Sequence, residues 1–314
     1  QARVQRDQAR VQRDQVRMQR GQEAGDDEMK SAALNALMQV SPDKALPILK
    51  QVLANREGNS DALRAQTMFI LSQIDSPETF DIMLDAVRND PSSKVREQAV
   101  FWLSKVDSPR AYEALAEILQ DPGYSELHQN AIFSLSQSSD PRAHGVLRDY
   151  AADASASAES RNAAIHWLGQ RPSDENAAFL RDLYSTIPNA ESRGQILYAL
   201  SLMKGHGNAA WLMERALDAN EDIELRKIAL HWAGQSGEVQ MAALIALYDR
   251  TDDRDVKEQL IFVYSRRDEA AAMDKLLEIA RTEADPELRK NAIFWIGQSG
   301  DPRAEDVLLE ILTQ

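Results

Sequence analysis

The sequence contains no cysteine among its 314 residues. Disulfide bonds, thiolate metal sites and a cysteine nucleophile are therefore excluded. The sequence also lacks any run of 18 or more apolar residues, so we expect no transmembrane helix. The missing cysteine and the residue Gln1, where an initiator methionine would stand, favour the periplasm or cell envelope over the cytoplasm. A leader ahead of Gln1 would fit that compartment.

Positive charge is scarce outside one short segment. The chain has 36 lysines and arginines against 50 aspartates and glutamates, a net charge of −14. Residues 1–20 hold six arginines and two aspartates, a net charge of +4, so the remainder carries −18. A body this acidic repels nucleic acid and anionic lipid over most of its surface. We therefore predict no nucleic-acid partner.

One motif recurs along the chain, (V/L)-R-x-x-A-(I/V)-aromatic-x-L. Successive copies lie 31 to 34 residues apart, counted from the position that holds arginine in most of them. A fixed period of this size is typical of a solenoid. This register position is occupied by Lys30, Arg64, Arg96, His128, Arg161, Arg193, Arg226, Lys257 and Arg289.

Each repeat has the pattern of two helices, as residues 91–120 illustrate. An apolar stripe at helical spacing precedes the turn Asp107-Ser108-Pro109, and a second stripe follows it. Neither helix can bury its stripe alone, so neighbouring repeats must stack to make a continuous core. No stretch alternates with period two, so we expect no sheet. The two predicted core stripes are Val95, Ala99, Val100, Leu103 and Val106, then Ala111, Leu115, Ile118 and Leu119.

These repeats resemble HEAT repeats, specifically the subtype typical of bacterial bilin lyases. The clearest matches are Asp90-Pro91 with Val95-Arg96, and Asp285-Pro286 with Leu288-Arg289 and Gly300-Asp301-Pro302. The resemblance implies an all-α, right-handed α-solenoid of about nine HEAT-like helix-pair repeats over residues 25–314. It also implies a protein-binding scaffold in which the arginine-bearing helix lines the inner, concave face.

Residues 1–24 form a basic, low-complexity arm with a heptad-like repeat, QARVQRD-QARVQRD-QVRMQRG. Its apolar residues are spaced two and five apart, whereas a coiled coil needs spacings of three and four. Two interpretations remain open. The arm is either solvated and irregular, or a helix whose arginines dock on an acidic solenoid, its own or a neighbour's.

Position numbers counted from the register residue separate the predicted core from the predicted surface. At about 100° per residue, positions +3, +4 and +7 face the core, and +2, +5 and +9 lie opposite. Position +6 flanks the core and is tryptophan in four repeats, where we expect it to pack between neighbouring repeats. These tryptophans are Trp102, Trp167, Trp232 and Trp295.

The +2, +5 and +9 positions of the inner helices predict a groove floor of rings flanked by amides. The candidate rings at +5 are Phe69, Phe101, Phe133, His166, Tyr198, His231, Phe262 and Phe294. The candidate amides at +2 and +9 are Gln66, Gln73, Gln98, Asn130, Gln137, Gln170, Gln195, Gln235, Gln259, Asn291 and Gln298.

The groove floor has two interpretations. As a recognition surface, its amides would bond the backbone of an extended chain and its rings would supply contact area, a use that is similar to that of armadillo proteins. As architecture, the rings would be buried between inner helices and the amides would form a structural hydrogen-bonded ladder. His166 and His231 are two repeats apart, about 20 Å at ordinary helix spacings, which is too far for a shared metal.

No catalytic motif accompanies the repeats. The sequence has no Walker loop, GxGxxG, GxSxG or HExxH. An enzyme of the deoxyhypusine-hydroxylase-like HEAT type would need His-Glu pairs, and no histidine here is followed by glutamate. We therefore predict a protein that is not an enzyme and has no cofactor or metal.

The leading hypothesis for function is a scaffold that holds an extended or helical segment of an unidentified protein along the inner face. The alternative is a structural subunit of a larger assembly, for instance in the cell envelope, that associates through the basic arm and the apolar C-terminal helix AEDVLLEILTQ. A third hypothesis, a pigment- or cofactor-attachment lyase-like protein, rests on the subtype resemblance alone.

Overall fold

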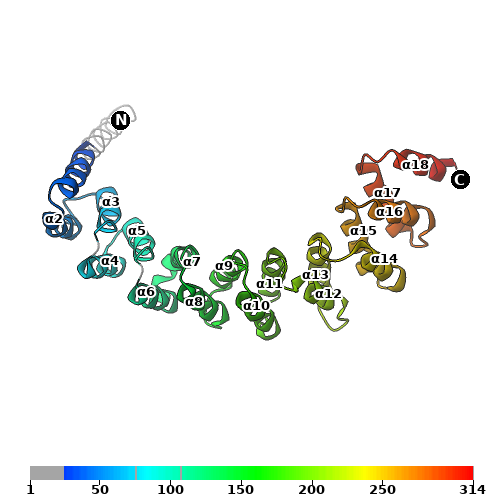
Figure 1. Ribbon diagram of the computed structural model, residues 1–314, viewed down its shortest axis with the longest axis horizontal. Helices are drawn as coiled ribbons and strands as arrows, with labels where there is room; N and C mark the ends of the chain where they lie inside the picture. Colours follow the sequence, from blue (N-terminus) through cyan, green and yellow to red (C-terminus); the bar gives the residue numbers. More distant parts are fainter. Residues whose placement is uncertain (1–24, 75, 107, 314) are drawn as a thin grey trace, which may run out of the picture. The chain divides into compact units, whose positions relative to one another are not determined.

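The computed structural model describes residues 25–74, 76–106 and 108–313, which form helices and the turns between them, with no strand in these ranges (Figure 1). The arm, and with it both interpretations of residues 1–24, lies outside the described residues. A first helix covers 25–40. The helices that follow are α2 (Pro42–Ala54), α3 (Asp61–Leu71), α4 (Pro77–Asn89), α5 (Ser93–Leu103), α6 (Pro109–Gln120), the 3₁₀ helix η1 (Pro122–Leu127), α7 (His128–Ser136), α8 (Pro141–Ala152), α9 (Ala158–Gly169), α10 (Asp174–Thr186), α11 (Ala190–Leu202), α12 (Asn208–Leu217), α13 (Ile223–Gln235), α14 (Met241–Arg250), α15 (Arg254–Ser265), α16 (Ala270–Thr282), α17 (Pro286–Gln298) and α18 (Arg303–Thr313).

Consecutive α-helices pair into repeats, starting with the helix over 25–40 and α2 and ending with α17 and α18. The described residues therefore form nine helix pairs, which confirms the predicted all-α solenoid. The chain divides into two compact units, Gln1–Tyr150 (unit 1) and Ala151–Gln314 (unit 2). Each unit is considered by itself below.

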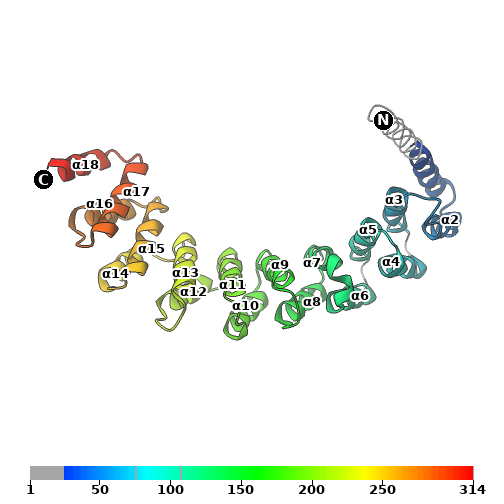
Figure 2. The same ribbon diagram turned by 180° about the vertical axis from the view of Figure 1, so that it is seen from behind.

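The odd-numbered and even-numbered helices of each unit form separate rows. In unit 1, α3, α5 and α7 pack side by side, and α4 and α6 lie in the second row (Figures 1 and 2). In unit 2, α9, α11, α13, α15 and α17 contact one another in that order. Every register residue after Lys30 belongs to an odd-numbered helix, so each repeat presents the same helix positions along its row.

Local sequence explains where the helices begin. The Ser60 hydroxyl accepts a hydrogen bond from the Leu63 amide at the start of α3, at 3.1 Å. Asp253 caps α15 in the same way, and Pro109 occupies the first turn of α6, where its missing N–H costs nothing. The predicted core stripes of residues 91–120 are buried except Val106, which follows the end of α5 and is half-buried.

The register residue joins its repeat to the next one. Arg64 is 1% exposed, and its guanidinium donates to both carboxylate oxygens of Asp90, at 3.0 and 3.1 Å. Asp90 lies in the turn ahead of α5, so this buried pair links successive repeats. Arg226 makes the equivalent contact with Asp253, at 2.9 Å. The arginine of the repeat motif therefore has a structural role in these repeats.

Small residues at position +8 let neighbouring odd-numbered helices approach closely. A Cβ atom at Gly169 of α9 would lie 2.8 Å from the backbone Cα of Ala199 in α11. A Cβ atom at Gly234 of α13 would overlap the side chain of Val263 in α15. Where +8 is serine, its hydroxyl donates to the +5 carbonyl, as Ser201 does to Tyr198 at 2.6 Å. This close packing brings the +5 side chains of successive repeats together.

Candidate functional site

All 19 predicted groove residues lie on odd-numbered helices or directly after their last turn, and none is buried. We divide them into two stripes. The unit-1 stripe comprises Gln66, Phe69, Gln73, Gln98, Phe101, Asn130, Phe133 and Gln137. The unit-2 stripe comprises His166, Gln170, Gln195, Tyr198, His231, Gln235, Gln259, Phe262, Asn291, Phe294 and Gln298. Three rings stand out as exposed, Phe294 at 55%, Phe69 at 41% and Phe133 at 40%, while the others are half-buried.

In unit 2 the +5 rings and the +6 tryptophans form one continuous chain of aromatic contacts. Consecutive ring centroids are 4.6 to 6.2 Å apart. His166 stacks on Tyr198 with an interplanar angle of 15°, and His231 stacks on Phe262 at 30°. In order, the rings are Trp167, His166, Tyr198, Trp232, His231, Phe262, Trp295 and Phe294.

Unit 1 contains a shorter chain of the same kind. Phe69 of α3 contacts Trp102 of α5 with centroids 5.2 Å apart, and Trp102 contacts Phe101 at 4.9 Å. Trp102 thus packs against a +5 ring of the preceding repeat, and Trp232 and Trp295 do the same in unit 2. Three of the four +6 tryptophans therefore pack between neighbouring repeats, as their position predicts.

The two interpretations of the rings are combined in the structure. Each chain of rings holds neighbouring repeats together, because offset and edge-to-face contacts stabilise the helix row. The same rings keep part of their surface open to solvent, because none of the stripe residues is buried.

The amides do not form the structural ladder that the second interpretation requires. In the part of the chain that the structure describes, no hydrogen bond joins stripe amides of neighbouring repeats. Their hydrogen bonds go to other groups: Gln66 accepts from the Ser31 hydroxyl at 2.6 Å, and Asn291 donates to Glu258 at 3.2 Å. Gln137 donates to Ser136 at 3.2 Å. Apart from Gln235, whose Nε2 atom is buried, the amides therefore retain donors or acceptors for another chain.

Nearby cations contact several of the rings, and partial burial changes the pKa of one histidine ring. The Arg266 guanidinium lies over both Phe262 and Trp295, 5.2 and 5.4 Å from their centroids, and Lys105 lies 5.2 Å from Phe101. Partial burial, assisted by the charge of Arg266, lowers the pKa of His231. The imidazole of His231 is therefore neutral at pH 7 and acts as an aromatic surface.

A hollow of about 330 Å³ opens on the unit-2 stripe. Phe262 and Trp295 line one part of it, and Asp255 and Glu258 line another, together with Lys227, Gln259 and Asn291.

Sequence reasoning missed a row of carboxylates beside the unit-2 rings. Position −2 lies four residues before +2, so it falls on the same helical face as +2, +5 and +9. Each of the five odd-numbered helices of unit 2 carries an aspartate or glutamate at position −2, and none of these five side chains is buried. The spacing of four residues was the available signal. The acid row consists of Glu159, Glu191, Glu224, Asp255 and Glu287.

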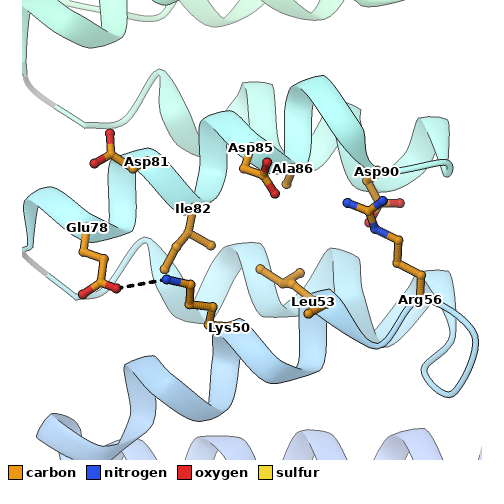
Figure 3. Close-up of a pocket in the computed structure, with 10 residues that line it drawn as sticks. Lys50, Leu53, Arg56, Glu78, Asp81, Ile82, Asp85, Ala86 and Asp90 are labelled. Carbon is orange, nitrogen blue, oxygen red and sulfur yellow. Dashed lines mark hydrogen bonds and ion pairs between the residues drawn. The ribbon is translucent and has the colours of Figure 1, made fainter.

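A larger cavity, which the sequence did not predict either, lies away from the stripes. It measures about 640 Å³ and lies between α2 and α4 in unit 1. Figure 3 shows Leu53 and Ile82 inside it and the acidic residues of α4 along its rim. Glu78 pairs with Lys50 at 3.3 Å, and Asp81 pairs with Arg110 at 2.7 Å. Glu78 and Asp81 of the rim are thus already paired.

No group of three or more histidines, aspartates or glutamates among the described residues is arranged to hold a metal ion. No helix in them is long and apolar enough to cross a membrane.

Comparison with known proteins bears on the repeats. Residues 55–136 match the family of HEAT repeats, and residues 288–314 match the PBS lyase HEAT-like repeat. The chain contains HEAT repeats. The resemblance in the Asp-Pro and Val/Leu-Arg motifs is therefore confirmed, because both HEAT matches cover motifs on which it rested.

No curated protein matches the chain at a significant level. Among solved structures, human deoxyhypusine hydroxylase in complex with glycerol is 18% identical, with 84% of this chain and 99% of that chain covered and a TM-score of 0.36. The complex of CpcE and CpcF of phycocyanin lyase from Nostoc sp. PCC7120 is 16% identical, with coverages of 79% and 93% and a TM-score of 0.35.

Proposed function

We propose that this HEAT-repeat protein is a scaffold, and that the ring-and-amide stripes of its odd-numbered helices bind an extended or helical segment of another protein. The observation that carries the proposal is the aromatic chain, which runs through five successive repeats of unit 2 and stays partly open to solvent. A contiguous row of aromatics that keeps part of its surface open to solvent is unusual without a partner.

The physical chemistry of the stripes supports recognition of a peptide. Rings offer large contact areas at a small cost in side-chain entropy. Amides without partners in neighbouring repeats can pair with both the N–H and the C=O groups of a bound backbone. The stripes offer contact area and hydrogen bonds, and we assign them no bond-making step.

A selection experiment with matched variants tests this function. A displayed library of random peptides is selected on the full chain, and the affinities of the enriched peptides are measured for two triple variants. The stripe variant is Phe69→Ala, Phe133→Ala and Phe294→Ala, the three exposed rings. The control variant is Ile48→Ala, Leu217→Ala and Leu309→Ala, three comparably exposed apolar residues on even-numbered helices.

We expect the stripe variant to lose at least about tenfold in affinity, or about 1.4 kcal/mol, because central aromatic residues dominate binding surfaces. The control variant should bind as the wild type does. Circular dichroism confirms that each variant remains helical. If no peptide is enriched, or if both variants bind equally well, the proposed function is wrong.

A further inference from the structure

The acid row and the ring row run side by side along unit 2. Along each odd-numbered helix, positions −2, +2, +5 and +9 are separated by four, three and four residues, so they share one face. Each of the five helices therefore presents a carboxylate about two turns ahead of a ring. In unit 1 the acid row is interrupted, because the same positions there hold Glu28, Ala62, Lys94 and Glu126.

The acid row keeps an excess of negative charge. Lys227 bridges Glu224 at 3.1 Å and Asp255 at 3.2 Å. Glu287 pairs with Lys290 at 2.6 Å. In the described part of the chain, Glu159 and Glu191 have no ion pair, although Glu191 accepts a hydrogen bond from the Asn162 amide at 3.2 Å. The surface thus suits a segment that brings several cations.

The repeat spacing sets the interval between those cations. Packed helices lie about 8–10 Å apart, and an extended chain advances about 3.3 Å per residue. A segment that matches the acid row would therefore carry a cation about every third residue at most. It would also carry apolar side chains between the cations, for contact with the rings.

The basic arm comes close to this spacing. Its arginines recur at intervals of three and four residues, at Arg3, Arg6, Arg10, Arg13, Arg17 and Arg20. Val4, Val11 and Met18 each follow directly after an arginine. The net charge of +4 in residues 1–20 complements an acidic body.

We propose that residues 1–20 of one copy of this chain bind the acid and ring rows of unit 2 in a second copy. The uninterrupted acid row of unit 2 complements the charge of the arm, and the sedimentation experiment below distinguishes docking between copies from docking within one chain. The inference rests on the proposed function, since it names an occupant for the unit-2 stripe, and it makes the protein a self-associating scaffold.

The first test uses a full chain whose own arm cannot compete, with all six arm arginines changed to glutamine. A fluorescein-labelled peptide of residues 1–20 is titrated into it and followed by anisotropy. We expect saturable binding that weakens with salt. Adding Glu159→Gln, Glu191→Gln and Glu224→Gln should weaken it at least about tenfold, because these changes remove the charge partners of the arginines.

A charge-matched control separates docking from general attraction. Asp182→Asn, Glu214→Gln and Glu305→Gln remove three exposed carboxylates from even-numbered helices of the same unit. These changes should alter the affinity less than about twofold. Equal losses in both triple variants, or no binding of the peptide, would overturn the proposal.

Sedimentation of the wild-type chain tests whether the contact joins two copies. We expect a mass that rises with concentration and returns to the monomer in the arginine-to-glutamine chain. A wild-type chain that stays monomeric at all concentrations would overturn docking between copies. Peptides selected from the library serve as the reference for the proposed function. If these peptides bind the unit-2 stripe while the arm peptide does not, only this inference fails. The proposed function then stands.

Discussion

The close approach of odd-numbered helices can be tested at two glycines that occupy the same repeat position. Gly169 and Gly297 both stand at +8. At Gly169 an added Cβ would lie 2.7 Å from Cβ and 2.8 Å from Cα of Ala199, whereas at Gly297 nothing lies within 4 Å. The two positions therefore differ in whether a neighbouring helix is close.

The expected effects of Gly→Ala have opposite signs. Alanine gains roughly 1 kcal/mol over glycine in a helix interior, so Gly297→Ala should stabilise the protein by about 0.5–1 kcal/mol. At Gly169 the obstacle includes backbone, which cannot rotate away, and overpacking costs about 1–3 kcal/mol. Gly169→Ala should therefore be destabilising by about 1–2 kcal/mol after the propensity gain is deducted.

Urea unfolding followed by circular dichroism measures both variants. Tryptophan fluorescence provides a local check, because Trp167 and His166 belong to the same helix as Gly169, and His166 stacks on Tyr198 of the next one. A Gly169→Ala variant that is as stable as Gly297→Ala would refute the claim that +8 sets the helix spacing and, through it, the ring contacts.

Two further predictions concern other residues of the repeats. Arg64→Ala leaves Asp90 buried without its partner and should lower the free energy of unfolding, measured in urea, by about 3–5 kcal/mol. Arg88→Ala breaks an exposed pair with Glu117 and should lower it by less than about 1 kcal/mol. Equal losses of stability would contradict the structural role of the register arginine. Because burial lowers the pKa of His231, the folded protein favours the neutral ring, so its contribution to stability is complete above the ordinary pKa of about 6.5 and is lost as the pH falls below it. His231→Gln should flatten that part of the stability–pH curve, and an unchanged slope would show that other groups cause it.

The fold could be predicted from the sequence because repetition multiplies a weak signal. One copy of Val95-Arg96 with Ala99 and Val100 is an ordinary amphipathic helix, but nine copies at a fixed period require stacking. Helix ends were predicted where proline or a capping residue fixes them, as at Pro109. The role of the register arginine was not predicted, because its partner Asp90 lies 26 residues away in sequence.

The candidate stripe could be predicted only in part. Helical geometry alone places Phe69 and Phe294 away from the core, and the structure leaves both exposed. The degree of exposure at His166 or Phe262 depends on how closely neighbouring helices approach, and that distance is set by small residues at +8, such as Gly169. The acid row was not predicted because the groove positions were counted from the register residue onward, and position −2 lies before that residue.

The central claim, that the ring stripes bind a partner segment, can be tested most directly by ¹⁹F NMR of the full chain labelled with 5-fluorotryptophan. Four of the five tryptophans belong to the stripes' ring contacts, and the fifth, Trp211, lies on the even-numbered helix α12 and serves as an internal reference. On titration with a library-selected peptide, resonances of Trp102, Trp167, Trp232 or Trp295 should shift and that of Trp211 should not. A shift at Trp211 with the four others unchanged would contradict the account.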